Sequence, residues 1–144
     1  MRFRSLALLV LLSTPAAAQS TRRQPVIPPG GAASATLTPG IRVGDVVYSS
    51  GQLGLSREKP DSTIQGQTRL ALENVKAVFE AAGTTMAMAA KCTVFLIDAR
   101  DFAGMNEVYR TFFPASPPAR STVVVAALVV PSGKVEIECI AAMP

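Results

Sequence analysis

The chain reads PARSTVVVAALVVPSGKVEIECIA from Pro118 to Ala141. β-Branched residues dominate the first half of this stretch, which predicts a long buried strand over Thr122–Val130. Pro131-Ser132-Gly133 predicts a turn. The alternation of apolar and polar residues over Val135–Ala141 predicts a last strand, which we expect to pair with the strand before it as a hairpin.

The elements upstream of this stretch complete a mixed fold. Val46–Tyr48 predicts a strand, and an apolar stripe at helical spacing predicts a helix over Ile64–Ala82 that ends at Gly83. The run Lys91–Ile97 is almost uniformly apolar, as expected of a central strand covered on both faces. A second helix should follow Asp101. This order predicts an α+β fold in which a mixed sheet carries both helices on one face.

A sheet with helices on one side leaves its other face to be covered. The predicted strand over Thr122–Val130 is too apolar to face water by itself. We therefore expect an oligomer, and a trimer in which three sheets close against one another would cover this face.

The N-terminal region reads as a leader and an arm. Residues 1–18 have a positive start, a short apolar run and an Ala16-Ala17-Ala18 cleavage pattern, which predict a secretory signal peptide. We therefore expect an exported protein, periplasmic or secreted, that does not associate with the membrane after cleavage. Residues 19–36 are rich in Ser, Thr, Pro and Gly and predict a flexible arm, and residues 37–144 form the folded domain.

The composition excludes several classes of site. The chain of 144 residues contains no histidine, which rules out Ser-His-Asp and Cys-His catalysis and histidine metal sites. Cys92 and Cys139 have no metal-binding spacing; they could pair in an oxidising compartment, but their strand positions indicate buried free thiols. The net charge of +4 comes without a basic block, so nothing favours nucleic-acid binding.

Three positions could carry chemistry. Arg120 follows a proline-stiffened loop and offers a planar fork suited to a carboxylate, although a surface salt bridge would also explain it. Glu136 and Glu138 project from one face of their strand. They are either solvated surface carboxylates or groups that take part in catalysis. Ser50-Gly51 lies at the end of a strand. The glycine there either lets a ligand approach the backbone closely or simply belongs to a turn.

These motifs together resemble the Rid family of reactive-intermediate deaminases (RidA/YjgF) over about 105 residues, from Gly40 to Pro144. The resemblance is carried by Val46–Gln52, Gln67-Thr68, Leu72–Val75, Ala82-Gly83, Lys91, Thr93–Leu96, Asp98, Asp101-Phe102, Asn106, Tyr109, Phe112-Phe113, Pro118–Ser121, Val123, Ala126, Leu128 and Val135–Ile137.

The resemblance implies a chorismate-mutase-like fold that assembles as a homotrimer with three clefts between subunits. It implies hydrolysis of reactive enamines and imines, such as 2-aminoacrylate, 2-iminobutanoate and 2-iminopropanoate, to 2-keto acids and ammonia without cofactor or metal. By the same resemblance Arg120 holds the substrate carboxylate and Glu136 activates the attacking water. Ser50 and Gly51 line the cleft, and Thr122 lies where the backbone contacts substrate.

One departure keeps a second function open. Leu37 stands where many active family members have a tyrosine, so one cleft-lining hydroxyl is missing. The alternative is a non-catalytic trimer that binds small carboxylates or partner proteins in the same cleft.

Overall fold

A computed structural model describes residues 23–56, 58 and 60–144. Its strands and α-helices are β1 (Gln24–Val26), β2 (Gly40–Val43), β3 (Val46–Ser49), β4 (Gln52–Leu53), α1 (Ile64–Ala82), β5 (Ala89–Leu96), α2 (Phe102–Phe112), β6 (Ala119–Val124) and β7 (Val135–Ala142).

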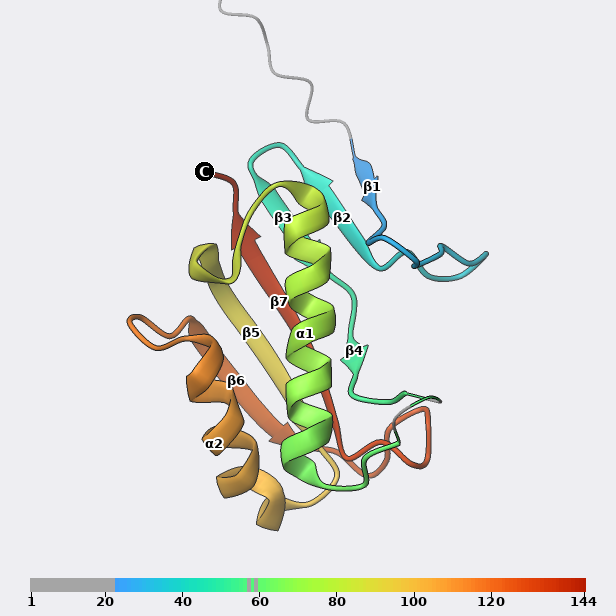
Figure 1. Ribbon diagram of the computed structural model, residues 1–144, viewed down its shortest axis with the longest axis vertical. Helices are drawn as coiled ribbons and strands as arrows, with labels where there is room; N and C mark the ends of the chain where they lie inside the picture. The colour runs from blue at the N-terminus through green and yellow to red at the C-terminus, as the bar shows by residue number, and fades with distance from the viewer. Residues whose placement is uncertain (1–22, 57, 59) are drawn as a thin grey trace, which may run out of the picture.

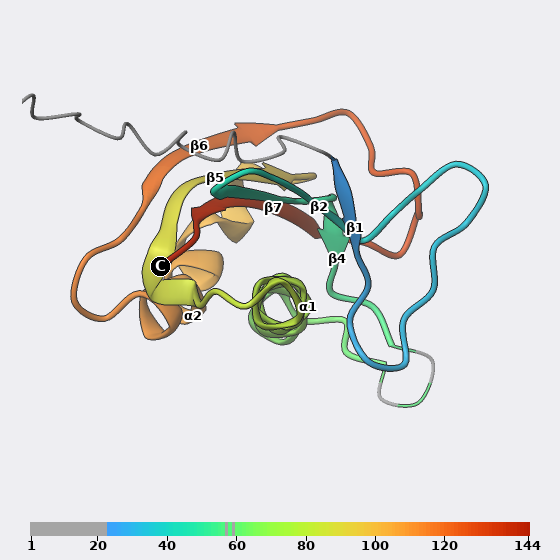
Figure 2. The same cartoon turned by 90° about the horizontal axis from the view of Figure 1, so that it is seen from above.

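All strands belong to one mixed sheet (Figure 1). Its strand order is β1-β2-β3-β7-β5-β6, and β4 pairs with β7 off this path. The β5–β6 pair is parallel and the others are antiparallel. Both helices lie on the same side of the sheet (Figure 2), which confirms the predicted fold class. None of the helices in the described part is long and apolar enough to cross a membrane.

Helix α1 supplies the larger part of the helical side of the core. The predicted range Ile64–Ala82 is confirmed at both ends. The Thr63 side chain accepts a hydrogen bond from the Gly66 N–H and caps the first turn. Gly83 ends the helix with a φ of 88°, a left-handed conformation that glycine adopts without steric cost.

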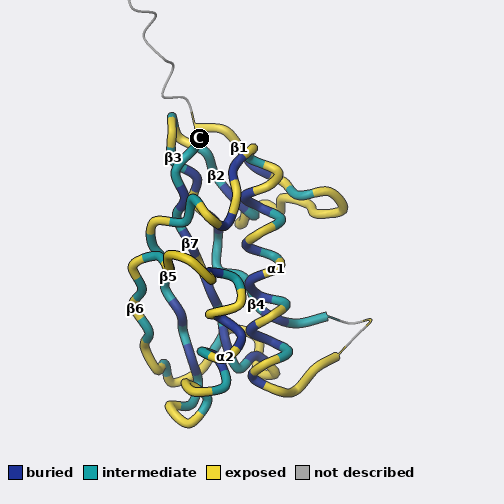
Figure 3. The backbone as a smooth tube through the Cα atoms, turned by 60° about the vertical axis from the view of Figure 1, so that its left-hand side comes forward, coloured by how far each residue is buried: buried dark blue, intermediate teal, exposed yellow. Residues whose placement is uncertain are grey.

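The core lies between the inner face of the sheet and the two helices (Figure 3). Every second residue of β7 is buried there, starting at Val135 and ending at Ala141. The residues between them, Glu136, Glu138 and Ile140, therefore lie on the outer face of the sheet, as the alternation predicts.

The predicted hairpin of the last two strands is wrong. Strand β6 ends at Val124, and the chain leaves the sheet over residues 125–134. Strand β5 lies between β6 and β7, parallel to the former and antiparallel to the latter. Helix α2 joins β5 to β6, and a crossover of this kind places its two strands side by side and parallel.

The expectation of free thiols is also wrong. Cys92 and Cys139 form a disulfide with a Cα–Cα distance of 4.1 Å. They are partners in the antiparallel register of β5 and β7. The Cys139 N–H donates to the Ser49 hydroxyl on the opposite side of β7, so it points away from Cys92. A cross-strand pair that exchanges no backbone hydrogen bonds is the closer kind of pair, which brings the two sulfurs together.

The predicted arm overlaps a strand. Residues 24–26 form β1, which pairs with β2 at the edge of the sheet. Residues 1–22, which include the predicted signal peptide, lie outside the described residues.

We predict that Gln67 fastens two loops to α1. Its buried amide donates to the Asp61 and Ser132 carbonyls and accepts from the Lys134 N–H, at 3.0, 3.1 and 2.7 Å. Gln67→Leu leaves these backbone groups without their partner, so the free energy of unfolding should fall by about 3 kcal/mol in urea titrations. The exposed Gln65, changed to Leu, should lower it by about 0.5 kcal/mol at most. Equal losses in both variants would contradict this role.

Candidate functional site

Arg120 rests against one face of α2. Its Nη1 donates to the Asn106 Oδ1 at 2.8 Å, and its guanidinium carbon lies 4.6 Å from the centre of the Tyr109 ring. The Phe102 ring lies farther away, at 5.7 Å. These three residues are spaced i, i+4 and i+7, so they share a helix face and hold the arginine in one orientation.

The Arg120 fork remains open to a ligand. Its Nε and Nη2 donate to no described residue, while Nη1 is held by Asn106. A cavity of about 560 Å³ adjoins it, and its lining residues are Asn106, Tyr109, Arg110, Phe113, Pro117, Pro118 and Arg120. Burial raises the pKa of Tyr109 to about 12, although the Arg120 charge opposes this, so the hydroxyl is neutral at physiological pH. The surroundings of Arg120 can therefore bind a small carboxylate.

Glu136 lies on the outer face of the sheet against Gly51. A Cβ at Gly51 would lie 1.8 Å from the Glu136 Oε1, so only glycine leaves room for this carboxylate. Its cross-strand neighbours are Leu53 on β4 and Phe95 on β5, both apolar. No described residue forms a hydrogen bond or ion pair with the carboxylate, which leaves it available to a water molecule.

The strand end that carries Gly51 is fastened to the loop before β2. The Ser50 hydroxyl donates to the Thr38 carbonyl at 2.6 Å, and the Ser50 N–H donates to the Pro39 carbonyl at 2.9 Å. Leu37, which precedes this contact, is 50% exposed. Ser50, Gly51 and Glu136 are thus brought together, with Leu37 in the adjoining loop.

One chain does not bring Arg120 and Glu136 together. Arg120 is the register partner of the buried Cys92, so it lies on the helix side, whereas Glu136 is the partner of Phe95 on the outer side. Their Cα atoms are roughly 14 Å apart, because they are offset by two strand spacings of about 4.8 Å across the sheet and by three residues of about 3.3 Å along it.

Thr122 and Glu138 occupy different surroundings. Thr122 is the register partner of the buried Val94, and its hydroxyl is buried with no partner among the described residues. Glu138 borders a small cavity of about 80 Å³ on the outer face, together with Lys91. Thr122 therefore shares the helix side with Arg120, and Glu138 shares the outer side with Glu136.

The contacts that orient Arg120 were missed in the sequence. Phe102 is exposed and faces the arginine. The i, i+4, i+7 spacing of Phe102, Asn106 and Tyr109 was a usable signal once Arg120 was suspected. Ser50 and Thr38 gave no such signal, because their contact joins residues twelve apart in irregular backbone.

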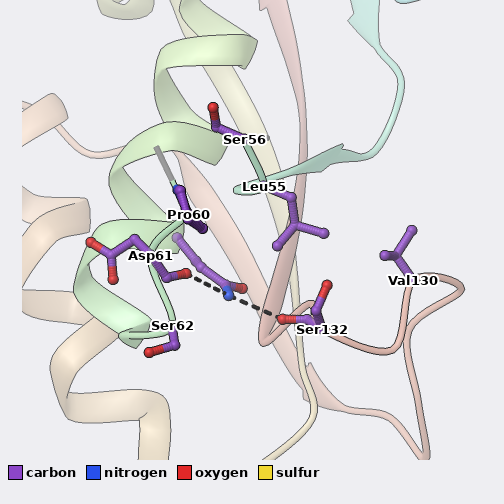
Figure 4. Close-up of a pocket in the computed structure, with 8 residues that line it drawn as sticks. Leu55, Ser56, Pro60, Asp61, Ser62, Val130 and Ser132 are labelled. Atoms are coloured by element: carbon purple, nitrogen blue, oxygen red, sulfur yellow. Dashed lines mark hydrogen bonds between the residues drawn. The ribbon is translucent and has the colours of Figure 1, made fainter. Parts of the chain in front are cut away.

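A cavity of about 620 Å³ lies elsewhere (Figure 4). Its lining residues are Leu55, Ser56, Pro60, Asp61, Ser62, Gln67, Val130 and Ser132, none of them a predicted site residue. The part of the chain that the structure describes holds no group of three His, Cys, Asp or Glu that could bind a metal ion.

Curated relatives match most of the folded domain. The mitochondrial protein mmf2 of Schizosaccharomyces pombe is 42% identical over 105 residues, 71% of this chain and 83% of the relative. The putative reactive intermediate deaminase TdcF of Escherichia coli is 44% identical over 108 residues, 71% of this chain and 82% of the relative. The chloroplastic Reactive Intermediate Deaminase A of Arabidopsis thaliana is 40% identical over 106 residues, 72% of this chain and 56% of the relative.

These relatives overturn the predicted signal peptide and periplasmic location. The two whose names state a compartment are mitochondrial and chloroplastic. The composition explains the error, because Arg2, Arg4 and several serines precede the first acidic residue, Asp45. A segment with arginine and serine but no acid is also typical of organelle transit peptides, so it does not single out secretion.

Solved structures share the fold at moderate identity. The yeast protein YEO7 superposes with a TM-score of 0.78 at 32% identity and covers 85% of this chain and 100% of its own. Escherichia coli TdcF with bound serine gives a TM-score of 0.73 at 40% identity, over 83% of this chain and 94% of its own. The family model described as endoribonuclease L-PSP matches residues 30–143. The chain therefore belongs to the endoribonuclease L-PSP family, which is also the YjgF/Rid family.

Proposed function

We propose that this protein hydrolyses reactive enamine and imine intermediates to 2-keto acids and ammonia. Relatives named reactive intermediate deaminases support this reaction. The observation that carries the proposal is the pair of open charged groups, the fork of Arg120 and the carboxylate of Glu136. The first suits the carboxylate of a 2-imino acid, and the second suits the water that attacks its imine carbon.

The chemistry requires only these two groups and a water molecule. Arg120 holds the substrate carboxylate through Nε and Nη2. The imine carbon is already electrophilic, and Glu136 accepts a proton as water adds to it. Glu136 then returns that proton to the nitrogen, which gives a carbinolamine. It next moves the proton of the added hydroxyl to the same nitrogen, so the carbon–nitrogen bond breaks and ammonia leaves as the carbonyl forms.

The site is completed by a second copy of the chain. Because Arg120 and Glu136 lie on opposite sides of one sheet, the Arg120 of one subunit must approach the Glu136 of another. A head-to-tail arrangement that closes as a ring brings the two together at every interface. The proposed assembly is a homotrimer, as the family resemblance implies, and it also covers exposed apolar residues of the outer face such as Tyr48 and Val123.

The proposed substrates are small 2-imino acids such as 2-iminopropanoate and 2-iminobutanoate. Serine, bound in the TdcF structure, supports a ligand with a carboxylate and a nitrogen on the adjacent carbon. Leu37 favours the second candidate, a cleft that binds small carboxylates without turnover, because it offers no hydroxyl. An amino-acid oxidase that releases imino acids, followed by measurement of keto acid formation with and without the protein, separates the two. Faster hydrolysis supports the deaminase, and binding without acceleration supports the second candidate.

Replacing Arg120 by lysine should weaken substrate binding. Lysine keeps the charge but loses the two-pronged geometry and the stacking on Tyr109. The expected loss in kcat/KM is about 2 kcal/mol, or roughly thirtyfold, with the folded state retained. The exposed Arg69, changed to lysine on α1, is the matched control and should have unchanged kinetics. A wild-type kcat/KM in Arg120→Lys would show that Arg120 does not hold the carboxylate.

The two glutamates of β7 should differ in their effect on turnover. Glu136→Gln keeps size and hydrogen bonding but removes the base, so kcat should fall by about 10²–10⁴-fold. Glu138→Gln should change kcat less than about twofold, because the side-chain atoms that lie against Gly51 belong to Glu136. Steady-state kinetics of the two variants check this order, and the reverse order would refute the assignment of Glu136.

Mixed trimers test whether the site spans two subunits. Inactive Arg120→Ala and Glu136→Gln subunits, unfolded together and refolded as mixed assemblies, should regain activity at interfaces where both native residues meet. Light scattering should first show that the mixture is trimeric. Trimers that form normally and regain no activity would place both residues in one subunit's site.

Gly51→Ala should separate catalysis from folding. The new Cβ would overlap only the end of the Glu136 side chain, which can swing away at small cost. The melting temperature should therefore stay within about 3 °C of the wild type, while kcat falls by at least about tenfold because the carboxylate is displaced. Full activity in a folded Gly51→Ala protein would show that the carboxylate acts elsewhere or not at all.

A further inference from the structure

The disulfide lies in a row of side chains that crosses four neighbouring strands. Cys139 of β7 is the register partner of Cys92 on β5, and Cys92 is the partner of Arg120 on β6. On the other side, the Ser49 hydroxyl of β3 accepts the Cys139 N–H at 2.9 Å. Ser49, Cys139 and Cys92 are buried on the helix side, and Arg120 lies on the same side against α2.

Each end of this row adjoins a part of the candidate site. Arg120 is one end and offers the carboxylate-binding fork. Ser49, at the other end, directly precedes Ser50 and Gly51, and Gly51 supports the Glu136 carboxylate. The disulfide is the covalent link in the middle of the row and joins β5 to β7, the two strands that lie between those carrying these groups.

Breaking the bond requires movement in a packed core. Bonded sulfurs are about 2.0 Å apart, whereas two unbonded sulfurs need at least about 3.5 Å. Both cysteines are 1% exposed and belong to the same buried cluster as Phe79 and Tyr109, so the thiols have little room to rotate. Close-packed interiors transmit such strain to their neighbours, here β6 on one side and the end of β3 on the other.

We propose that the Cys92–Cys139 disulfide is a positioning element of the site, which holds Arg120 and the Ser50-Gly51 strand end each in the position that serves its own cleft. This inference rests on the proposed function. In a trimer the two ends of each row belong to different clefts, so one disulfide positions two sites. The bond forms as the two thiols lose two electrons and two protons to a small-molecule disulfide, which is reduced to two thiols. Its burial makes it a lasting cross-link that reductants reach only when the strands open.

The test compares reduced and oxidised forms of the full chain. Protein made and purified under reductant is assayed with oxidase-generated imino acids, then oxidised with a small-molecule disulfide and assayed again. Mass spectrometry after alkylation in denaturant should count two thiols in the first form and none in the second. Oxidation should lower KM by roughly tenfold, because the Arg120 fork recovers its position, and it should also raise kcat, because Gly51 again supports the Glu136 carboxylate. The melting temperature should rise by on the order of 10 °C.

Two variants separate positioning from stability. The double variant Cys92→Ala/Cys139→Ala should behave like the reduced form and ignore the oxidant. Val75→Ala, in the buried face of α1, removes core packing but changes no residue of the row, so it should lower the melting temperature and leave KM unchanged. Equal KM in the two redox forms, or an equal rise in KM in Val75→Ala, would overturn the positioning role. Failure to form the disulfide on oxidation would overturn it as well.

Hydrogen exchange keeps the test independent of the proposed reaction. If neither form hydrolyses imino acids, the proposed function fails. Faster amide exchange of β6 and of residues 49–51 in the reduced form would then still support the positioning role, and unchanged exchange there would overturn it.

Discussion

The position of β5 between β6 and β7 is the constraint on which the site depends. It makes β6 a parallel edge strand, with Arg120 turned toward α2, and it leaves Glu136 on the uncovered face two strands away. No rotation of side chains within one sheet can join groups on its two faces. The proposal that a second subunit completes the site therefore follows from strand order and side-chain alternation.

The elements with local signals were predictable from the sequence. Thr63, the apolar stripe and Gly83 fix α1 at both ends, and the alternation of β7 fixes which residues face the core. The pairing of strands was not predictable, because Val123 and its neighbours are compatible with a hairpin and with a parallel edge. The α2 crossover decides that β6 pairs with β5. The hairpin prediction considered only the turn after the apolar strand and not the crossover before it.

The same difference applies to the site. Arg120, Glu136 and Gly51 were selected by residue type, by strand-end position and by family resemblance, and the structure places Gly51 against Glu136. The support around Arg120 depends on how α2 packs on β6, so the spacing of Phe102, Asn106 and Tyr109 was informative only together with Arg120. The disulfide was missed for a similar reason, because its two cysteines are 47 residues apart and meet through register alone.

The two names attached to the family lead to different chemical expectations. Cleavage of RNA by acid–base catalysis commonly uses histidine, which this chain lacks, and the net charge includes no basic block to hold a phosphate backbone. A small carboxylate and a hydrolysable imine need one fork and one base, and Arg120 and Glu136 have those properties. The side chains therefore favour deaminase activity over endoribonuclease activity, the two activities after which the family is named.

The central claim is that Arg120 and Glu136 of different subunits share one substrate. A crystal structure of the oxidised protein with a 2-keto acid, the product of the proposed reaction, tests it most directly. We expect a trimer in which the ligand carboxylate accepts hydrogen bonds from Arg120 of one subunit. The ligand's carbonyl carbon should lie close enough to the next subunit's Glu136 for a single water molecule to fit between the two. A ligand bound by Arg120 with no Glu136 from another subunit near its carbonyl carbon would contradict the account.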